Sequence, residues 1–223
     1  MPRTGRALKG GYCYDVVNWG NERREVFHEP NDYAAFLALM VEANCHQAMR
    51  LLAYCLMPNH FHFVLWPVGD RDISRWMHWL TTTHVRRYRR QYGGTGHLWQ
   101  GRFKPFPIED DDHLLTVVRY VERNPARANL VDCAADWAWS SLGSPPTDMW
   151  TPPLHSGPVP RGVNWLEHVN QPLTEAELAA LRRSAERGTP YGSSPWIETT
   201  AKILGLQFTL RPRGRPARSS CDP

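Results

Sequence analysis

The fold of this chain is decided by the apolar run LMPNHFHFVLW at residues 56–66, in which two histidines alternate with aromatic side chains. Side chains on a β-strand point alternately to opposite faces, so Phe61 and Phe63 can enter a core while His60 and His62 project together from the other face. Their Cα atoms would lie roughly 6.5 Å apart, close enough for one metal ion to bridge both imidazoles. The run therefore predicts a strand that carries a two-histidine metal site, although two polar positions on a half-exposed strand would give the same pattern.

A second group of residues downstream favours the metal site. In the segment VVRYVERNP at residues 117–125, Tyr120 and Asn124 are four positions apart and share one face of a predicted helix. They fall on the flank of its apolar stripe, whereas Arg119 and Arg123 are expected to face away. We therefore expect Tyr120 and Asn124 to lie where this helix meets the histidine strand.

The remaining hydrophobic pattern predicts alternating strands and helices in the first two thirds of the chain. We expect a strand at 12–17, a helix from 31, one long strand at 49–66, a helix from 73 to 93, a short hairpin at 96–106 and a helix from 110 to 125.

Proline and glycine become frequent near residue 145, which indicates a domain boundary. We expect a catalytic domain at 1–145, a linker at 146–172 and a helical tail at 173–223. In the tail, Thr174 and Glu177 form a capping-box pattern that predicts a helix to about Arg187, and Ser194 begins a second helix that ends at Gly205.

Arginine and lysine are concentrated in a few stretches, so the local charge is more informative than the net charge of +4 or the pI of about 8.9. A solvated surface would explain such runs, but aromatic residues are interleaved with them, as in proteins that bind single-stranded nucleic acid. The end of the sequence also matches the core of a minor-groove AT-hook. The predicted DNA-binding residues are Arg86, Arg87, Arg89, Arg90, Trp99, Arg102, Lys104, Arg119, Arg123, Arg213 and Arg215.

The five cysteines have no C-x-x-C spacing, which indicates neither a disulfide framework nor a zinc ribbon and is typical of a reducing cytoplasm. No stretch approaches the roughly 18 apolar residues of a membrane span, and the first residues lack the apolar region of a secretion signal. We expect a cytoplasmic protein without a membrane partner.

Residues 10–142 resemble the IS200-type transposases of the HUH class, and more closely the REP-associated tyrosine transposases. The resemblance rests on MPNHFH at 57–62, WQGRFK at 99–104 and YVERNPARANLV at 120–131. It implies an α+β fold in which an antiparallel sheet is flanked by helices, a ferredoxin-like HUH domain, here with a small, helical and basic C-terminal appendage. The chain has Trp19 where the family pattern has an arginine after the first strand.

Residue by residue, the resemblance implies that His60, His62 and Asn124 bind a divalent ion and that Tyr120 is the nucleophile. Imidazole pairs generally suit zinc or other transition metals, but the family implies Mg²⁺ or Mn²⁺, which we adopt. The implied activity is a metal-dependent single-stranded DNA endonuclease and strand transferase. It would act on hairpin-forming, REP-like repeat DNA through a covalent 5′-phosphotyrosine, as a monomer or a homodimer. The alternative is a domesticated, non-catalytic binder of structured nucleic acid.

Overall fold

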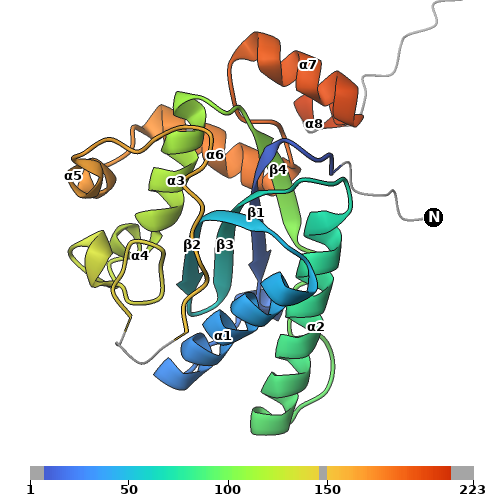
Figure 1. Cartoon of the computed structure of the whole chain (residues 1–223), viewed down its shortest axis with the longest axis vertical. Coiled ribbons are helices and arrows are strands. Elements are labelled where there is room, and N and C mark those ends of the chain that lie inside the picture. Colours follow the sequence, from blue (N-terminus) through green and yellow to red (C-terminus); the bar gives the residue numbers. More distant parts are fainter. Residues whose placement is uncertain (1–7, 146–149, 212–223) are drawn as a thin grey trace, which may run out of the picture.

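The computed structural model describes residues 8–145 and 150–211, which contain one antiparallel sheet flanked by helices (Figure 1). The strands β1 (Cys13–Trp19), β2 (Arg50–Met57), β3 (His60–Trp66) and β4 (Lys104–Ile108) are arranged in the order β2-β3-β1-β4. The predicted α+β class is confirmed. The single long strand expected at 49–66 is wrong, because Pro58 and Asn59 form a tight turn between two paired strands.

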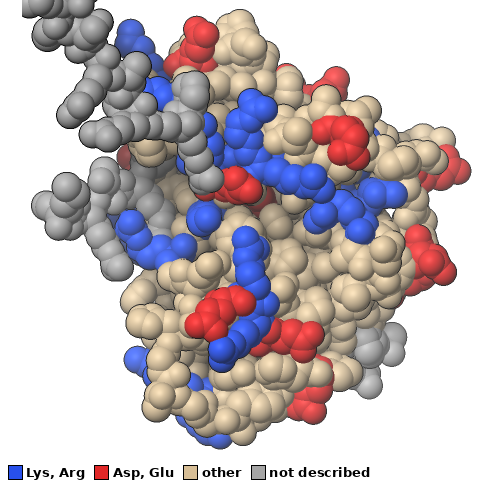
Figure 2. Space-filling view, turned by 180° about the vertical axis from the view of Figure 1, so that it is seen from behind, with Lys and Arg blue, Asp and Glu red and all other residues tan. Residues whose placement is uncertain are grey.

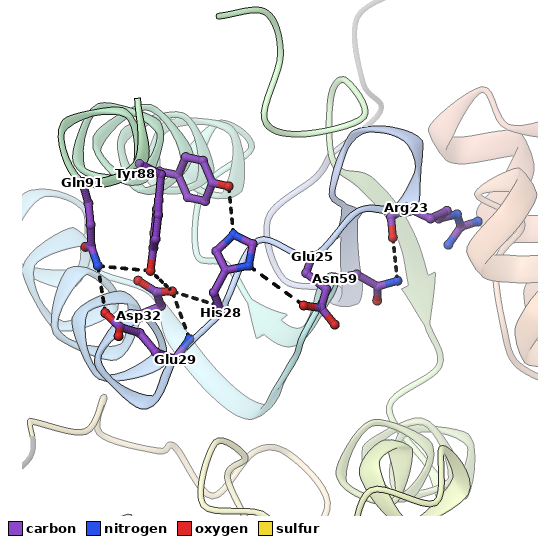
Figure 3. Close-up of polar contacts among 9 residues, drawn as sticks. Arg23, Glu25, His28, Glu29, Asp32, Asn59, Tyr88 and Gln91 are labelled. Atoms are coloured by element: carbon purple, nitrogen blue, oxygen red, sulfur yellow. Dashed lines mark hydrogen bonds and ion pairs between the residues drawn. The ribbon is translucent and has the colours of Figure 1, made fainter. Parts of the chain in front are cut away.

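Two long helices cover the face of the sheet that carries Phe61 and Phe63. These are α1 (Pro30–His46) and α2 (Asp72–Tyr92), which pack against each other and against the aromatic side chains of β3. Polar contacts join the two helices at one end (Figure 3). Tyr92 donates a hydrogen bond to Asp32 over 2.8 Å, and the Tyr88 hydroxyl lies 2.9 Å from Nε2 of His28.

The opposite face of the sheet is covered by α3 (Asp112–Glu122) and α6 (Glu175–Arg187), as Figure 1 shows. Asp111 caps α3 by accepting a hydrogen bond from the backbone of His113, as the acidic run near residue 110 predicted. The helix ends at Glu122, and a separate turn of helix, α4 (Asn124–Arg127), continues through Pro125. The predicted end of the helix at Pro125 was therefore wrong, because proline fits the first turn of a new helix.

The C-terminal helices begin and end where their sequence signals indicate, but they are not a detached tail. Thr174 forms a reciprocal capping box with Glu177, and Gly205 ends α7 (Ser194–Leu204) in a left-handed conformation. Leu181 of α6 is fully buried in the core beneath α3. Tyr191 exchanges backbone hydrogen bonds of 2.9 Å with residues on either side of Ile108 in β4. The short helix α8 (Gln207–Leu210) follows.

The proline-rich segment before α6 also contacts the sheet. The backbone amide of His155 donates to the Leu51 carbonyl over 2.8 Å, and Arg161 donates to the Leu52 carbonyl over 2.6 Å. Along the same strand, the Ser141 amide donates to the Tyr54 carbonyl. These contacts cover the otherwise exposed edge of β2. Two short elements, η2 (Ala134–Asp136) and α5 (Trp165–Asn170), contact each other.

The expected hairpin at 96–106 does not form. Residues 98–100 instead pair with the chain after β1, at η1 (Asn21–Arg23), and β4 begins only at Lys104. Trp99 is 5% exposed and packs against Phe61 and Phe27, so it offers no exposed stacking surface. None of the helices in the described ranges is long and apolar enough to cross a membrane.

Candidate active site

The two histidines of β3 project together from the face of the sheet that α3 covers. Their rings lie 5.4 Å apart between centroids, while Phe61 and Phe63 enter the core on the α1 side. The alternation predicted from residues 56–66 is therefore confirmed. His62 is buried beneath α3, and His60 is half-buried at the start of the strand.

Both imidazoles are held through Nδ1. Nδ1 of His62 lies 3.1 and 3.2 Å from the two carboxylate oxygens of Asp15, a fully buried residue of β1, and Nδ1 of His60 lies 2.7 Å from Oδ1 of Asn59. A carboxylate that accepts the Nδ1 proton fixes the tautomer and leaves the Nε2 lone pair for a metal. Burial lowers the pKa of His60 well below its usual value, and the neighbouring His62 ring and the charge of Arg127 lower it further. The neutral form required of a ligand is thus favoured.

The hydroxyl-bearing residue of the site is Tyr120, near the end of α3. Its ring meets the His62 ring edge to face at 5.6 Å between centroids, and the side chain is 7% exposed. Burial raises the pKa of Tyr120, whereas the positive charge of Arg127 opposes that rise. The expected position of Tyr120 over the histidine strand is confirmed.

Asn124 stands at the start of α4, one helical turn after Tyr120, and is 1% exposed. Its Oδ1 accepts a hydrogen bond of 2.5 Å from Arg127, and its Nδ2 is buried without a partner. Oδ1 keeps a second lone pair. Together with the imidazoles of His60 and His62, it would make a weak, uncharged set of metal ligands. Such a set fits a divalent ion that DNA phosphate and water would complete, and does not fit a permanently bound structural zinc.

Two cationic side chains lie over Trp19, which is the strand partner of His60. The guanidinium of Arg23 lies 4.3 Å from the Trp19 ring centroid, the ammonium of Lys104 lies 5.1 Å from it, and the ring stacks on His60 at 6.4 Å. The sequence did not single out Arg23. Its backbone adopts a left-handed conformation with φ of 61°, which no sequence pattern signals.

The predicted DNA-binding residues are distributed over different environments. Arg86, Arg89 and Arg102 are exposed and line a cleft of about 480 Å³ between α2 and the loop before β4. Seen from behind, Lys and Arg side chains form a broken band across the middle of the molecule (Figure 2). The other exposed or half-buried members of this set are Arg87, Arg90, Lys104 and Arg123.

The expectation that Arg119 faces away from the packed interior is wrong. Arg119 is 8% exposed and donates to the backbone carbonyls of Gln171 and Pro172 over 2.8 Å. Arg123 donates to the Asn170 carbonyl over 3.3 Å. Both arginines therefore hold the segment before α6 against α3. The AT-hook residues Arg213 and Arg215 lie outside the described residues.

A second group of potential metal ligands lies at the opposite end of β1. Glu109, Asp111 and His113 place one ligand atom each within 4.8 Å of one another. These side chains already have protein partners, because Asp111 caps α3 and Glu109 accepts hydrogen bonds from Ser193. The group is separate from His60 and His62, since β1 pairs with His60 at Trp19 and with Ile108 at Cys13.

Comparisons with known proteins point in one direction. A family model described as "Transposase IS200 like" matches residues 10–124. A Haemophilus influenzae protein named as a candidate REP-associated tyrosine transposase is 28% identical over 146 residues, which is 60% of this chain and 81% of that protein. The structure of a REP-associated tyrosine transposase bound to a REP hairpin matches with a TM-score of 0.50. That match has 24% identity and covers 64% of this chain and 82% of the other, so it shows the shared fold.

Proposed function

Because the chain belongs to the IS200-like transposase family, we propose that it cleaves and rejoins single-stranded DNA through Tyr120, with a divalent ion held by His60, His62 and Asn124. The observation that carries this proposal is the contact between the Tyr120 and His62 rings, which come from α3 and β3. Tyr120 and His62, the proposed nucleophile and one proposed metal ligand, are 58 positions apart in the sequence.

In the proposed reaction, the Tyr120 oxygen attacks the scissile phosphorus in line with the 3′ oxygen that leaves. An O–P bond to tyrosine forms and the P–O3′ bond breaks, which gives a 5′-phosphotyrosine and a free 3′ hydroxyl. The phenol loses its proton to water and the departing oxygen gains one. Mg²⁺ or Mn²⁺, when bound, would neutralise charge on a non-bridging oxygen of that phosphate. A second 3′ hydroxyl can reverse the step and transfer the strand without ATP.

The chain's own residues would prepare this step. Asp15 orients His62, burial keeps His60 neutral, and α4 holds Asn124 beside the nucleophile. We propose that DNA with a hairpin, such as the REP hairpin in the structural relative, lies along the basic surface. The cleft lined by Arg86, Arg89 and Arg102 would hold phosphates of that DNA.

The test is covalent adduct formation. The protein is incubated with labelled single-stranded hairpins from repeats that flank its own gene, with Mg²⁺ or Mn²⁺, and an SDS-resistant adduct is measured. Tyr120→Phe retains the ring contact with His62 and removes the hydroxyl, so the adduct should disappear. The matched control is Tyr191→Phe, a buried tyrosine beside β4 at the far end of the sheet, which should leave the adduct unchanged.

The possible outcomes lead to different conclusions. An adduct that requires both Tyr120 and the metal supports the transposase. Tight hairpin binding by the wild-type protein without any adduct would refute the proposed chemistry and leave a non-catalytic binder. Loss of the adduct in Tyr191→Phe as well would show that the assay reports folding rather than the nucleophile.

A further inference from the structure

We infer that Arg127 is a catalytic residue that binds the non-bridging oxygens of the scissile phosphate beside Tyr120. This inference rests on the proposed function of the same site and adds an anion-binding group to it. Neither the family match at residues 10–124 nor the sequence patterns assign any role to position 127.

The guanidinium of Arg127 contacts two residues of the proposed active site, Tyr120 and Asn124. Its central carbon lies 5.3 Å from the centroid of the Tyr120 ring, and its terminal nitrogen donates to Oδ1 of Asn124. Its charge also acts on the imidazole of His60. Arg127 therefore contacts the nucleophile's ring and one proposed metal ligand, and its field reaches a second.

The position of the side chain follows from α4. The helix has one turn, so Asn124 and Arg127 lie three positions apart on one face. The turn is fixed at its end, because the Leu130 amide donates to the Pro125 carbonyl over 3.0 Å and Asn129 adopts a left-handed φ of 55°. Arg127 is thus supported by a well-bonded segment of backbone.

Arg127 differs from the two arginines that precede it at four-residue intervals. The guanidinium groups of Arg119 and Arg123 donate hydrogen bonds to backbone carbonyls at residues 170–172. Arg127 instead donates to the side-chain amide oxygen of Asn124. Its Nε is buried without a partner, as is Nε of Arg119. In the described residues, no carboxylate forms an ion pair with it. Among the described residues, its charge is therefore not balanced by a salt bridge.

This surplus of positive charge matches the chemistry of the substrate. A guanidinium presents paired N–H donors that fit two oxygens of one phosphate, and charge builds on those oxygens as tyrosine attacks. A preorganised cation beside the nucleophile stabilises that charge without reorganisation. On DNA binding, Arg127 would exchange its hydrogen bond to Asn124 for the phosphate and so release Oδ1 of Asn124.

The test compares the loss of two charges: the positive charge of Arg127 in the protein and the negative charge of the scissile phosphate in the DNA. In a Tyr120→Phe background with chelator present, affinity is measured for a hairpin with a normal scissile phosphate and for one with a neutral methylphosphonate there. Arg127→Ala should weaken binding of the normal hairpin by about tenfold or more. It should not weaken binding of the methylphosphonate hairpin further. Arg71→Ala, which removes one exposed charge beyond the far end of β3, is the matched control.

Cleavage gives the second readout. In single-turnover assays with the tyrosine restored, Arg127→Ala should lower the rate by about 10²-fold or more, and Arg127→Lys should recover part of it, since lysine keeps the charge but not the paired donors. Equal weakening of both hairpins by Arg127→Ala would overturn the inference, as would an unchanged cleavage rate. Failure of the wild-type protein to form any adduct would instead refute the proposed function. The two failures can be told apart, because the binding measurements do not depend on cleavage.

Discussion

Asp15 offers the sharpest test of the metal site, because it is fully buried and its only described polar partner is Nδ1 of His62. Replacing a carboxylate that orients a metal-bound histidine typically lowers metal affinity by about 10- to 100-fold. Asp15→Asn retains an oxygen acceptor for Nδ1 of His62, which lies 3.1–3.2 Å from the Asp15 carboxylate, but loses the negative charge. We therefore expect metal affinity to fall about tenfold. Asp15→Ala loses both the acceptor and the charge and leaves Nδ1 of His62 without a partner. We therefore expect metal affinity to fall about 100-fold, which is about 2.7 kcal/mol of binding free energy.

The assay is calorimetric titration with Mn²⁺ of the Tyr120→Phe protein bound to an uncleaved hairpin, because DNA phosphate should complete the site. The control is Asp32→Asn, which removes another buried carboxylate on the opposite face of the sheet. Asp32 caps the start of α1 (Figure 3) and accepts a hydrogen bond from Tyr92. The control should bind Mn²⁺ like the parent. If both Asp15 variants also bind Mn²⁺ like the parent, the reasoning about His62 is refuted.

Three further predictions concern stability. Burial lowers the pKa of His84 to about 3, so the unfolded chain binds more protons below pH 6.5 and stability falls as the pH drops, by about 2 kcal/mol at pH 5. His84→Phe should remove that loss in thermal melts at pH 7.5 and 5, and an unchanged loss would contradict it. Arg161→Ala should destabilise the fold by about 1–3 kcal/mol, because Arg161 pairs with buried Glu122 at 3.3 Å. Burial raises the pKa of Glu122 above 4.5, so the penalty for its charged form grows as the pH rises, and urea titrations should show a larger loss at pH 8 than at pH 5. Leu181→Ala should cost about 2–5 kcal/mol in one cooperative urea transition, whereas two separate transitions would show that α6 folds apart from the sheet.

The parts of the fold that the sequence predicts correctly depend on short-range periodicity. Alternation places His60 and His62 on one face of a strand, and four-residue spacing places Tyr120 one helical turn before Asn124. Both follow from strand and helix geometry, which holds whatever lies around them. The capping box at Thr174 is equally local. The single long strand at 49–66 is wrong because both strands of the hairpin are buried, so the apolar run shows no break except at Pro58 and Asn59.

Sequence periodicity fails where distant segments meet. The periodicity of one helix predicts only which of its faces is apolar, and it places Arg119 on the polar face. Nothing near Arg119 predicts that its guanidinium donates hydrogen bonds to carbonyls some 50 positions later. In the sequence, Asp15 is one polar residue in a run of strand-forming residues. Its buried charge acquires meaning only through the diagonal contact with His62 on the neighbouring strand.

The position of Trp19 shows how a family feature can be replaced by different residues. The resemblance implies an arginine there, yet the indole itself carries no charge. In the folded chain the Arg23 guanidinium and the Lys104 ammonium both lie over the Trp19 ring, from η1 and from the start of β4. Cation–π contact fixes the two flexible side chains near His60, where an anionic strand would approach the proposed metal site. Positive charge is thus restored at this end of the sheet by residues that are neighbours only in three dimensions.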